Sequence, residues 1–493
     1  MTVVENGEAR GWQRLLIEPP RPESVRRLPK AYVLAIAAVC IGAFMGQLDA
    51  SIVTLAFPSL ARTFHASASA VSWVGLSYLL VLVGTLTAFG RLSDMVGRKL
   101  LYIYGFAVFV VGSALCAAAP DLATLVGFRV IQAVGAAMLQ ANSVAIIALA
   151  VPAGRLGRSL GIQGAAQALG LALGPSVGGL LLAAGGWRLI FLVNVPVGIL
   201  GIVAALVFVP RSRHLSPRTP FDWAGFALFL PAVAALVFGV SRGNALGWAS
   251  AAIVGSFAAA GALGVLFVLR ERRCRAPMVD VRLFRRRSFS SGIVGAMLAF
   301  VVLFGVLVVV PYYLERAHGA GTVRTGFELM AMPVALGIVA PLSGRLADRI
   351  GTRLPAVAGM FISAAALLGL AAWRPDGLAF AGLLALLGAG AGLFTAPNNA
   401  GVMSSCPASQ SGVASGLLNT SRGLGTALGL AAATTVFVAA GGDSGSAMQV
   451  AHAFSVTAVA LAGVAVAAAL AAGLGAEPGP LSPHREGAAA AVA

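Results

Sequence analysis

The feature that most constrains this chain is a series of about fourteen apolar runs, each close to the length that a helix needs to cross a lipid bilayer. Within hydrocarbon, a helix satisfies all its own backbone hydrogen bonds. Mean hydropathy is +0.91 and only 10% of residues are charged, far from soluble usage. The sequence therefore predicts an all-α integral membrane protein. The runs cover approximately residues 32–57, 72–91, 100–119, 122–150, 160–184, 188–209, 222–241, 249–269, 290–314, 325–345, 354–373, 378–403, 412–438 and 450–473.

Basic residues alternate between loops in a way that predicts the orientation. Every second loop is rich in arginine, whereas the opposite loops carry about one basic residue each. Because basic loops stay in the cytoplasm, we expect both termini there. Lysine occurs only at Lys30 and Lys99, and the abundance of alanine and glycine is typical of a GC-rich bacterial genome. We therefore expect a multi-pass protein of the bacterial inner (plasma) membrane.

Two similar charged stretches, residues 90–99 and 344–353, indicate two related halves. Their separation exceeds the roughly 180 to 210 residues that six helices with short loops require. The excess predicts two extra helices between the halves. The expected organisation is a cytoplasmic tail (1–30), a six-helix bundle (31–210), a linker with two extra transmembrane helices (211–287), a second six-helix bundle (288–474) and a disordered tail (475–493).

Residues 90–99 resemble the loop between the second and third helices that marks the major facilitator superfamily. Further stretches resemble motifs of its fourteen-helix drug:proton antiporter branch, in the same order along the chain: residues 48–58, 128–135, 170–179, 187–196 and 221–225. The resemblance implies the major facilitator fold, with six, two and six helices. It also implies alternating access to a central site and exchange of substrate for protons.

The first charged loop has the composition of a conformational latch, formed by Gly90, Arg91, Asp94, Gly97 and Arg98. Gly90 permits close helix approach, and Asp94 can accept hydrogen bonds or face the positive end of a neighbouring helix. The resemblance implies that the latch stabilises the outward-open state. The alternative is a topology anchor with no further role.

The second copy of this loop contributes Asp348 and Arg349, and it matches the first less closely. We expect it to act as the corresponding latch of the second half, and the topology-anchor alternative applies to it equally.

Asp49 is the main candidate for proton coupling, because a carboxylate within a spanning helix is costly and marks a functional site. Counted along their helices from the outer ends, Asp49 lies roughly 12 Å deep and Arg129 roughly 10 Å deep. The sequence therefore predicts an Asp49–Arg129 pair, direct or through Gln132. A plain salt bridge in the outer leaflet is the alternative.

Glu328, just inside the outer end of its helix, is a candidate for a second proton or cation site. Its alternative role is to pair with Arg316 or Arg324 in the adjoining loop.

The fifth run carries a glycine face, with Gly170, Gly174 and Gly178 spaced every four residues and Gly179 one step round. Such a face lets another helix approach closely, and Pro175 removes a backbone donor and bends the helix. The resemblance implies that the bend limits leakage through the unloaded carrier. Tight packing alone is the alternative.

Other polar residues within apolar runs are candidates for a substrate cavity between the halves, where carriers of this type bind substrate. A buried Arg must face protein or water, and the sequence does not identify the group in the second half that pairs with Arg422. Hydrogen bonds between helices are the alternative role for the amides. The candidates are Gln132, Gln163, Gln167, Asn398, Asn399, Asn419 and Arg422.

These features favour proton-coupled export of small amphipathic drugs or antibiotics, cations among them. Export of an endogenous metabolite, lipid or siderophore is an alternative, and a membrane sensor or channel is the alternative outside transport. The sequence contains no ATP-binding lysine loop and no HExxH motif, so we expect neither an enzyme nor a cofactor or metal. The net charge of +17 is spread through short loops, which argues against nucleic-acid binding. We expect a monomer in the bilayer.

Overall fold

The computed structural model describes residues 18–152, 154–212, 215, 220–443 and 446–475. Within these ranges it has no strand, and fourteen of its spans are long and apolar enough to cross a membrane. The prediction of an all-α membrane protein is confirmed. The predicted tails fall mostly outside the described residues.

The spanning helices follow the predicted runs closely. The first six spans are α2 (Ala31–Thr63), α3 (Ala68–Val96), α4 (Arg98–Ala118), α5 (Leu122–Ala150), α6 (Leu156–Gly185) and the pair α7 (Trp187–Leu192) and α8 (Asn194–Phe208). The next two are α9 (Trp223–Leu246) and α10 (Ala251–Arg273). The last six are α11 (Arg287–Ala317), α12 (Thr322–Ile350), α13 (Arg353–Trp373), α14 (Gly377–Ser404), α15 (Ser411–Ala439) and α16 (Ala447–Leu474). Short helices α1 (Glu23–Arg26), η2 (Val281–Arg285) and η3 (Ala408–Gln410) lie between or before them.

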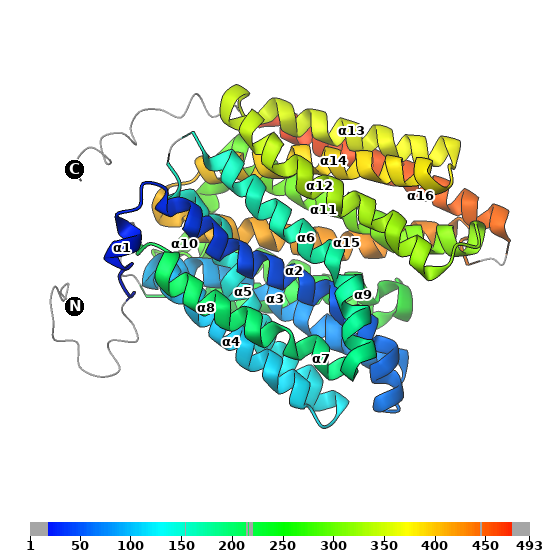
Figure 1. The fold of residues 1–493 in the computed structure, drawn as a ribbon, viewed down its shortest axis with the longest axis horizontal. Helices are drawn as coiled ribbons and strands as arrows, with labels where there is room; N and C mark the ends of the chain where they lie inside the picture. The colour runs from blue at the N-terminus through cyan, green and yellow to red at the C-terminus, as the bar shows by residue number, and fades with distance from the viewer. Residues whose placement is uncertain (1–17, 153, 213–214, 216–219, 444–445, 476–493) are drawn as a thin grey trace.

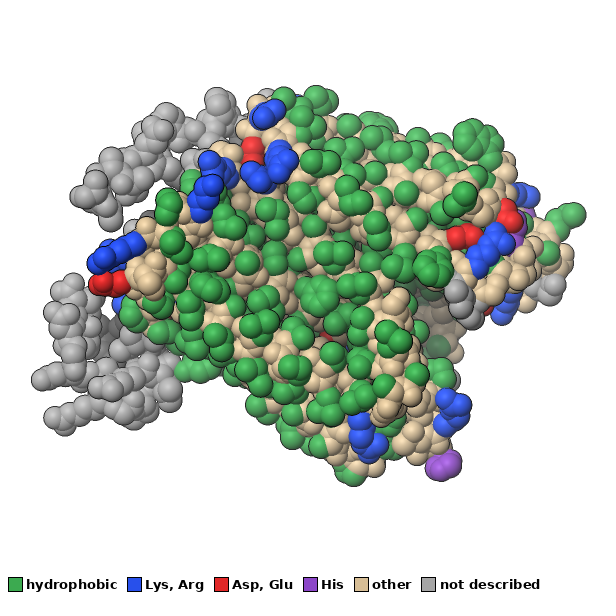
Figure 2. Space-filling view, viewed as in Figure 1, with side chains coloured by type: hydrophobic (Ala, Val, Ile, Leu, Met, Phe, Trp, Pro, Cys, Tyr) green, Lys and Arg blue, Asp and Glu red, His purple; other side chains and the backbone are tan. Residues whose placement is uncertain are grey.

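The spans run back and forth between two ends of the molecule. We call proximal the end at which α2 begins and α16 ends, and distal the opposite end; they lie at the left and right of Figure 1. In Figure 2 charged side chains gather toward these two ends, and the surface between them is mainly hydrophobic. This belt is the surface that a bilayer would cover.

Glycines make the tight proximal turns of the two repeated loops. Gly97 is the single residue between α3 and α4 and has φ of 122°, and Gly351 follows α12 with φ of 90°. Residues with a Cβ rarely adopt this region, so glycine is required for such short links.

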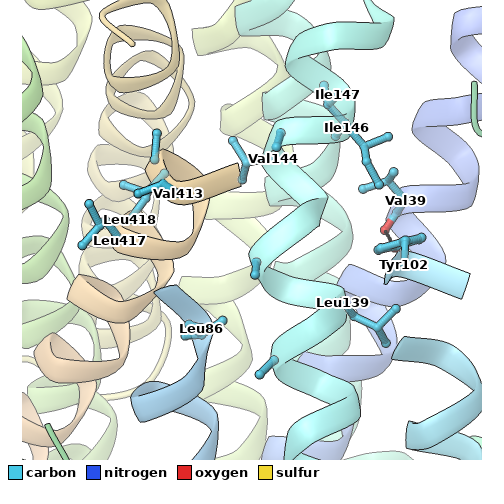
Figure 3. Packing of buried hydrophobic residues seen from close by; sticks show 14 of the residues in the cluster. Val39, Leu86, Tyr102, Leu139, Val144, Ile146, Ile147, Val413, Leu417 and Leu418 are labelled. Atoms are coloured by element: carbon cyan, nitrogen blue, oxygen red, sulfur yellow. Dashed lines mark hydrogen bonds between the residues drawn. The ribbon is translucent and has the colours of Figure 1, made fainter. Parts of the chain in front are cut away.

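The buried apolar cores show how the two bundles meet. Leu86 of α3, Val144 of α5 and Val413 of α15 belong to one cluster that joins both bundles toward the proximal end (Figure 3). Two larger clusters each stay within one bundle: one draws its members only from residues 52–191, toward the distal end, and the other only from 299–472. A small fourth cluster still joins α3 and α15 through α9, with Val83, Val237 and Ala431 among its members. The main cores of the two bundles are therefore separate toward the distal end, where Figure 2 shows a notch between two lobes.

The two extra helices lie beside the junction between the bundles. Helix α9 packs on α3 and α15, and α10 packs mainly on α9. Near its distal end, Arg242 of α9 donates to Ser72 of α3 at 3.1 Å, and Asn244 donates to the carbonyl oxygen of Ala431 in α15 at 3.2 Å. Thus Arg242 connects α9 to the N-terminal bundle, and Asn244 connects α9 to the C-terminal bundle.

Candidate functional site

The first functional feature is an ion pair sealed inside the N-terminal bundle. Arg129 Nη1 of α5 donates to Asp49 Oδ2 of α2 at 2.8 Å. Asp49 is fully buried and Arg129 is 1% exposed. Because α2 continues to Thr63, Asp49 lies about 20 Å from its distal end at 1.5 Å per residue, deeper than the sequence predicts. The pair itself is the one that the sequence predicts.

Neutral polar groups complete the environment of this carboxylate. Gln132 Nε2 and Asn194 Nδ2 donate to Asp49 Oδ1 at 2.9 and 2.8 Å. Gln132 Oε1 also accepts from Arg129 at 2.6 Å, so it bridges the two charges. Charge-assisted hydrogen bonds of this kind stabilise the ionised pair without water.

Asn194 was missed by sequence reasoning as a site residue, although it is a polar residue inside the predicted apolar run 188–209. The break between α7 and α8 places it at the first turn of α8, where Pro196 lacks the N–H that would continue α7. Tyr78 is one of the aromatic residues that the sequence suggests could hold a cation, with an interfacial anchor as its alternative role. Its ring lies 4.0 Å from the Arg129 guanidinium carbon and contributes a cation–π contact.

The second feature is the charged loop at the proximal end, which the sequence predicts to act as a latch. Asp94 of α3 accepts from the backbone N–H groups of Gly412 and Val413 at 2.8 and 3.0 Å, at the start of α15. Arg98 pairs with Asp94 and donates to the carbonyl oxygen of Ala408 at 2.9 Å. A carboxylate of the first bundle thus neutralises the positive end of a helix in the second.

Gly90 and Arg91 complete this loop. A Cβ at Gly90 would lie 2.3 Å from the carbonyl oxygen of Gly412, so only glycine allows this approach of the bundles. Arg91 is half-buried.

The second copy repeats the arrangement with the bundles exchanged. Asp348 of α12 accepts from the N–H groups of Gly157 and Arg158 at 2.8 and 3.0 Å, at the start of α6. A Cβ at Gly344 would lie 2.1 Å from the Gly157 carbonyl oxygen. Arg349 lines a surface groove beside Asp348, together with Arg155, Arg158 and Arg345. Each bundle therefore caps a helix of the other, and the proximal end is closed twice.

A cavity of about 50 Å³ lies between the bundles at mid-depth. Its polar lining is Gln47, Gln167 and Thr395, all neutral. The other lining residues are apolar or glycine: Gly164, Ala168, Leu171, Phe300, Leu303, Phe304, Leu307, Met332, Pro333 and Leu336. Of the residues predicted from sequence for the cavity, the lining includes Gln167.

The remaining predicted cavity residues bond between or within helices. Gln132 belongs to the ion pair, Gln163 donates to Ser143 at 2.9 Å, and Asn398 donates to the carbonyl oxygen of Gly292 at 3.0 Å. For these three amides the structure matches the alternative of interhelical bonding.

Asn419 crosses between the bundles and donates to the Gln140 carbonyl oxygen at 3.0 Å. Asn399 accepts from Arg422 Nη2 at 2.5 Å. The partners of Arg422 are therefore amides.

Glu328 lies in the C-terminal bundle near the distal end, 7% exposed. Its Oε1 accepts from Arg324 at 2.7 Å, and Arg324 also pairs with Asp376. The geometry matches the alternative in which Glu328 serves an arginine of the adjoining segment.

The glycine face of α6 packs against α2. A Cβ at Gly170 would lie 2.4 Å from the Phe44 carbonyl oxygen, and one at Gly174 would lie 2.2 Å from Ser51 Oγ. Pro175 cannot donate to the carbonyl of Leu171, four residues earlier, and Ser51 Oγ donates to that oxygen instead at 3.2 Å. The neighbouring helix α2 thereby satisfies the carbonyl oxygen that Pro175 leaves without its usual donor.

Gly170→Ala is expected to destabilise the protein by about 1–3 kcal/mol, because the added methyl meets backbone that cannot move aside. Gly178 faces Ile52 in the same interface. A methyl group added at Gly179 would have no other atom within 4 Å, so Gly179→Ala is the matched control. Thermal unfolding in detergent measures both; an equal effect of the two substitutions would contradict the packing account.

Comparison with known proteins agrees with this architecture. A family model described as Major Facilitator Superfamily matches residues 39–430 and 292–491. The chain belongs to the major facilitator superfamily. Its family and fold are those of transporters rather than enzymes.

Two relatives that are similar to this chain have names that indicate different substrates. The riboflavin transporter RibZ of Clostridioides difficile is 31% identical over 407 residues, which are 82% of this chain and 88% of RibZ. The multidrug resistance protein Stp of Mycobacterium tuberculosis is 35% identical over 413 residues, 83% of this chain and 76% of Stp. Among solved structures, the human organic anion transporter MFSD10 shares the fold, with a TM-score of 0.64 and 16% identity over 90% of this chain and 100% of its own.

Proposed function

We propose that this major facilitator protein exports small amphipathic molecules, drugs or antibiotics among them, in exchange for protons. The observation that carries the proposal is the buried Asp49–Arg129 pair, which lies apart from the cavity and has no role in joining the bundles. A titratable carboxylate in that position suits coupling better than substrate contact. The relation to the multidrug resistance protein Stp supports export as the direction.

In this proposal the proximal end faces the cytoplasm and the structure is an outward-facing state. The support is the double closure by Asp94 and Asp348, together with the separation of the main cores toward the distal end. Protonation of Asp49 would release Arg129 and favour the opposite state, in which the latches open. Substrate would then enter the cavity from the cytoplasm.

A second candidate is transport of an endogenous metabolite. It is supported by the relation to RibZ, whose name assigns it riboflavin, and by a cavity in which aromatic rings accompany neutral amides. A sensor or channel is less well supported, because neither needs two matched latches.

Everted membrane vesicles containing the full-length protein test the proposal with a panel of cationic, neutral and acidic fluorescent dyes. We expect at least one dye to accumulate when respiration acidifies the lumen, and to leave when an ionophore collapses the pH gradient. Equal distribution of every dye with and without the gradient would contradict proton-coupled export.

A further inference from the structure

Arg422 is a buried cation on α15, about 15 Å along the helix from its proximal end. Its side chain is held by neutral groups. Nη2 donates to Asn399 Oδ1 at 2.5 Å and Nη1 to Asn419 Oδ1 at 3.3 Å. Its guanidinium carbon lies 5.3 Å from the centre of the Phe300 ring, and Nε is buried without a hydrogen-bond partner.

No carboxylate of the described residues neutralises this charge. The buried acids that form ion pairs have other partners: Asp49 with Arg129, Asp94 with Arg98, Asp222 with Arg270 and Glu328 with Arg324. A buried cation without a counter-charge is costly, and an ionisable residue within a membrane span is a candidate for a substrate or ion pathway.

Arg422 lies beside the central cavity. Phe300, which its guanidinium faces, is part of the cavity lining. Asn399, which it binds, follows the lining residue Thr395 by one turn of α14, toward the proximal end. The guanidinium therefore lies next to the proximal side of the cavity.

The cavity lining carries no charge of its own, since its polar members are two glutamines and a threonine. In a low-dielectric site the nearest uncompensated charge dominates the potential. That charge is positive. Phe300 and Phe304 offer aromatic surface to a ring system, and the two glutamines offer hydrogen bonds.

We propose that the cavity selects aromatic amphipathic molecules that carry an anionic group, such as a carboxylate, and that Arg422 is the residue that recognises this group. The inference rests on the proposed function, because it takes this cavity as the substrate site. It narrows the range of substrates that the sequence predicts, which included cations. The lining has no acidic side chain to pair with a cation, and the nearby Arg422 would repel one. The unpartnered Nε leaves the guanidinium a proton to donate to an acid.

Two dyes that differ by one methyl group test the proposal. Rhodamine 110 has a free carboxylate, and rhodamine 123 is its methyl ester. Fluorescence anisotropy with the purified full-length protein in detergent measures the affinity for each. We expect rhodamine 110 to bind about tenfold more tightly, which corresponds to about 1.4 kcal/mol. R422Q should bind the two dyes equally, whereas R422K should keep part of the preference.

Two further variants keep the test decisive. N399D places a carboxylate beside the guanidinium with almost no change of shape, so it should remove the preference even if R422Q does not fold. R316Q removes a positive charge from an exposed side chain at the distal end and should leave the preference intact.

Tighter binding of the ester by the wild type, an unchanged preference in R422Q and N399D, or binding of neither dye would overturn the inference. The vesicle assay separates this from failure of the proposed function. Gradient-driven accumulation of cationic dyes alone would overturn the anion preference and leave proton-coupled export standing. A preference for rhodamine 110 in binding without any gradient-driven transport would overturn proton-coupled export and leave the anion preference standing.

Discussion

Asp49→Asn is expected to abolish proton-driven accumulation of substrate, with a loss of at least about tenfold, or about 1.4 kcal/mol. Asparagine keeps the shape of the side chain and one acceptor oxygen, but it cannot bind and release a proton. Arg129 then has no titrating partner in its buried site. Dye accumulation in everted vesicles, at matched expression, measures the loss.

The matched control is Asp121→Asn, which makes the same chemical change at the exposed N-terminal cap of α5. Asp121 accepts from the Thr124 N–H at 2.8 Å, and asparagine caps helices comparably. Transport by this variant should remain close to that of the wild type. Efflux of substrate down its own concentration gradient should also survive in Asp49→Asn, because the cavity is unchanged. If Asp49→Asn still accumulates dye in response to the pH gradient, the assignment of the proton site is wrong.

Asp94→Asn is expected to open the proximal end. The substitution removes the charge that neutralises both Arg98 and the start of α15, and one of the two backbone donors loses its acceptor. Hydrogen bonds to charged groups contribute about 1.5–3 kcal/mol each, so the closed state should lose at least about tenfold in population.

A cysteine at position 87 reports this opening in a variant whose four native cysteines have been replaced. Thr87 is fully buried and contacts Thr420 across the two bundles at 3.0 Å. A water-soluble maleimide should label Thr87→Cys at least about tenfold faster when Asp94→Asn is also present.

Asp348→Asn should increase the labelling less, because Asp348 makes no ion pair with an arginine of its own loop among the described residues. The choice of substrates should stay the same, because the latch does not line the cavity. A changed range of substrates with unaltered turnover would contradict the latch.

The sequence predicted the features of this structure that depend on residue spacing along the chain. Helix spans follow from apolar length. The Asp49–Arg129 pair was predicted from depths counted within the apolar runs, and the structure contains the pair although α2 extends beyond its run. The latch loops follow from glycine and charge spacing, and the acceptance of α15 N–H groups by Asp94 agrees with the predicted helix-end contact.

Depth does not specify which way a side chain faces. Gln163 and Gln167 are one turn apart, yet the first bonds Ser143 in a helix interface and the second lines the cavity. Both positions exclude lipid, so hydropathy cannot distinguish them. Hydropathy also does not predict that Asn398 bonds the Gly292 backbone. Nor does it predict that the Phe300 ring faces Arg422. These placements require the packing of both bundles.

The most direct test of the central claim is proton movement driven by substrate alone. Proteoliposomes containing the purified full-length protein and a trapped pH-sensitive dye are loaded with substrate and diluted into substrate-free buffer at the same pH. Antiport predicts that the lumen acidifies as substrate leaves, and that Asp49→Asn gives substrate efflux without acidification. Efflux from the wild type with no change in luminal pH would contradict proton exchange.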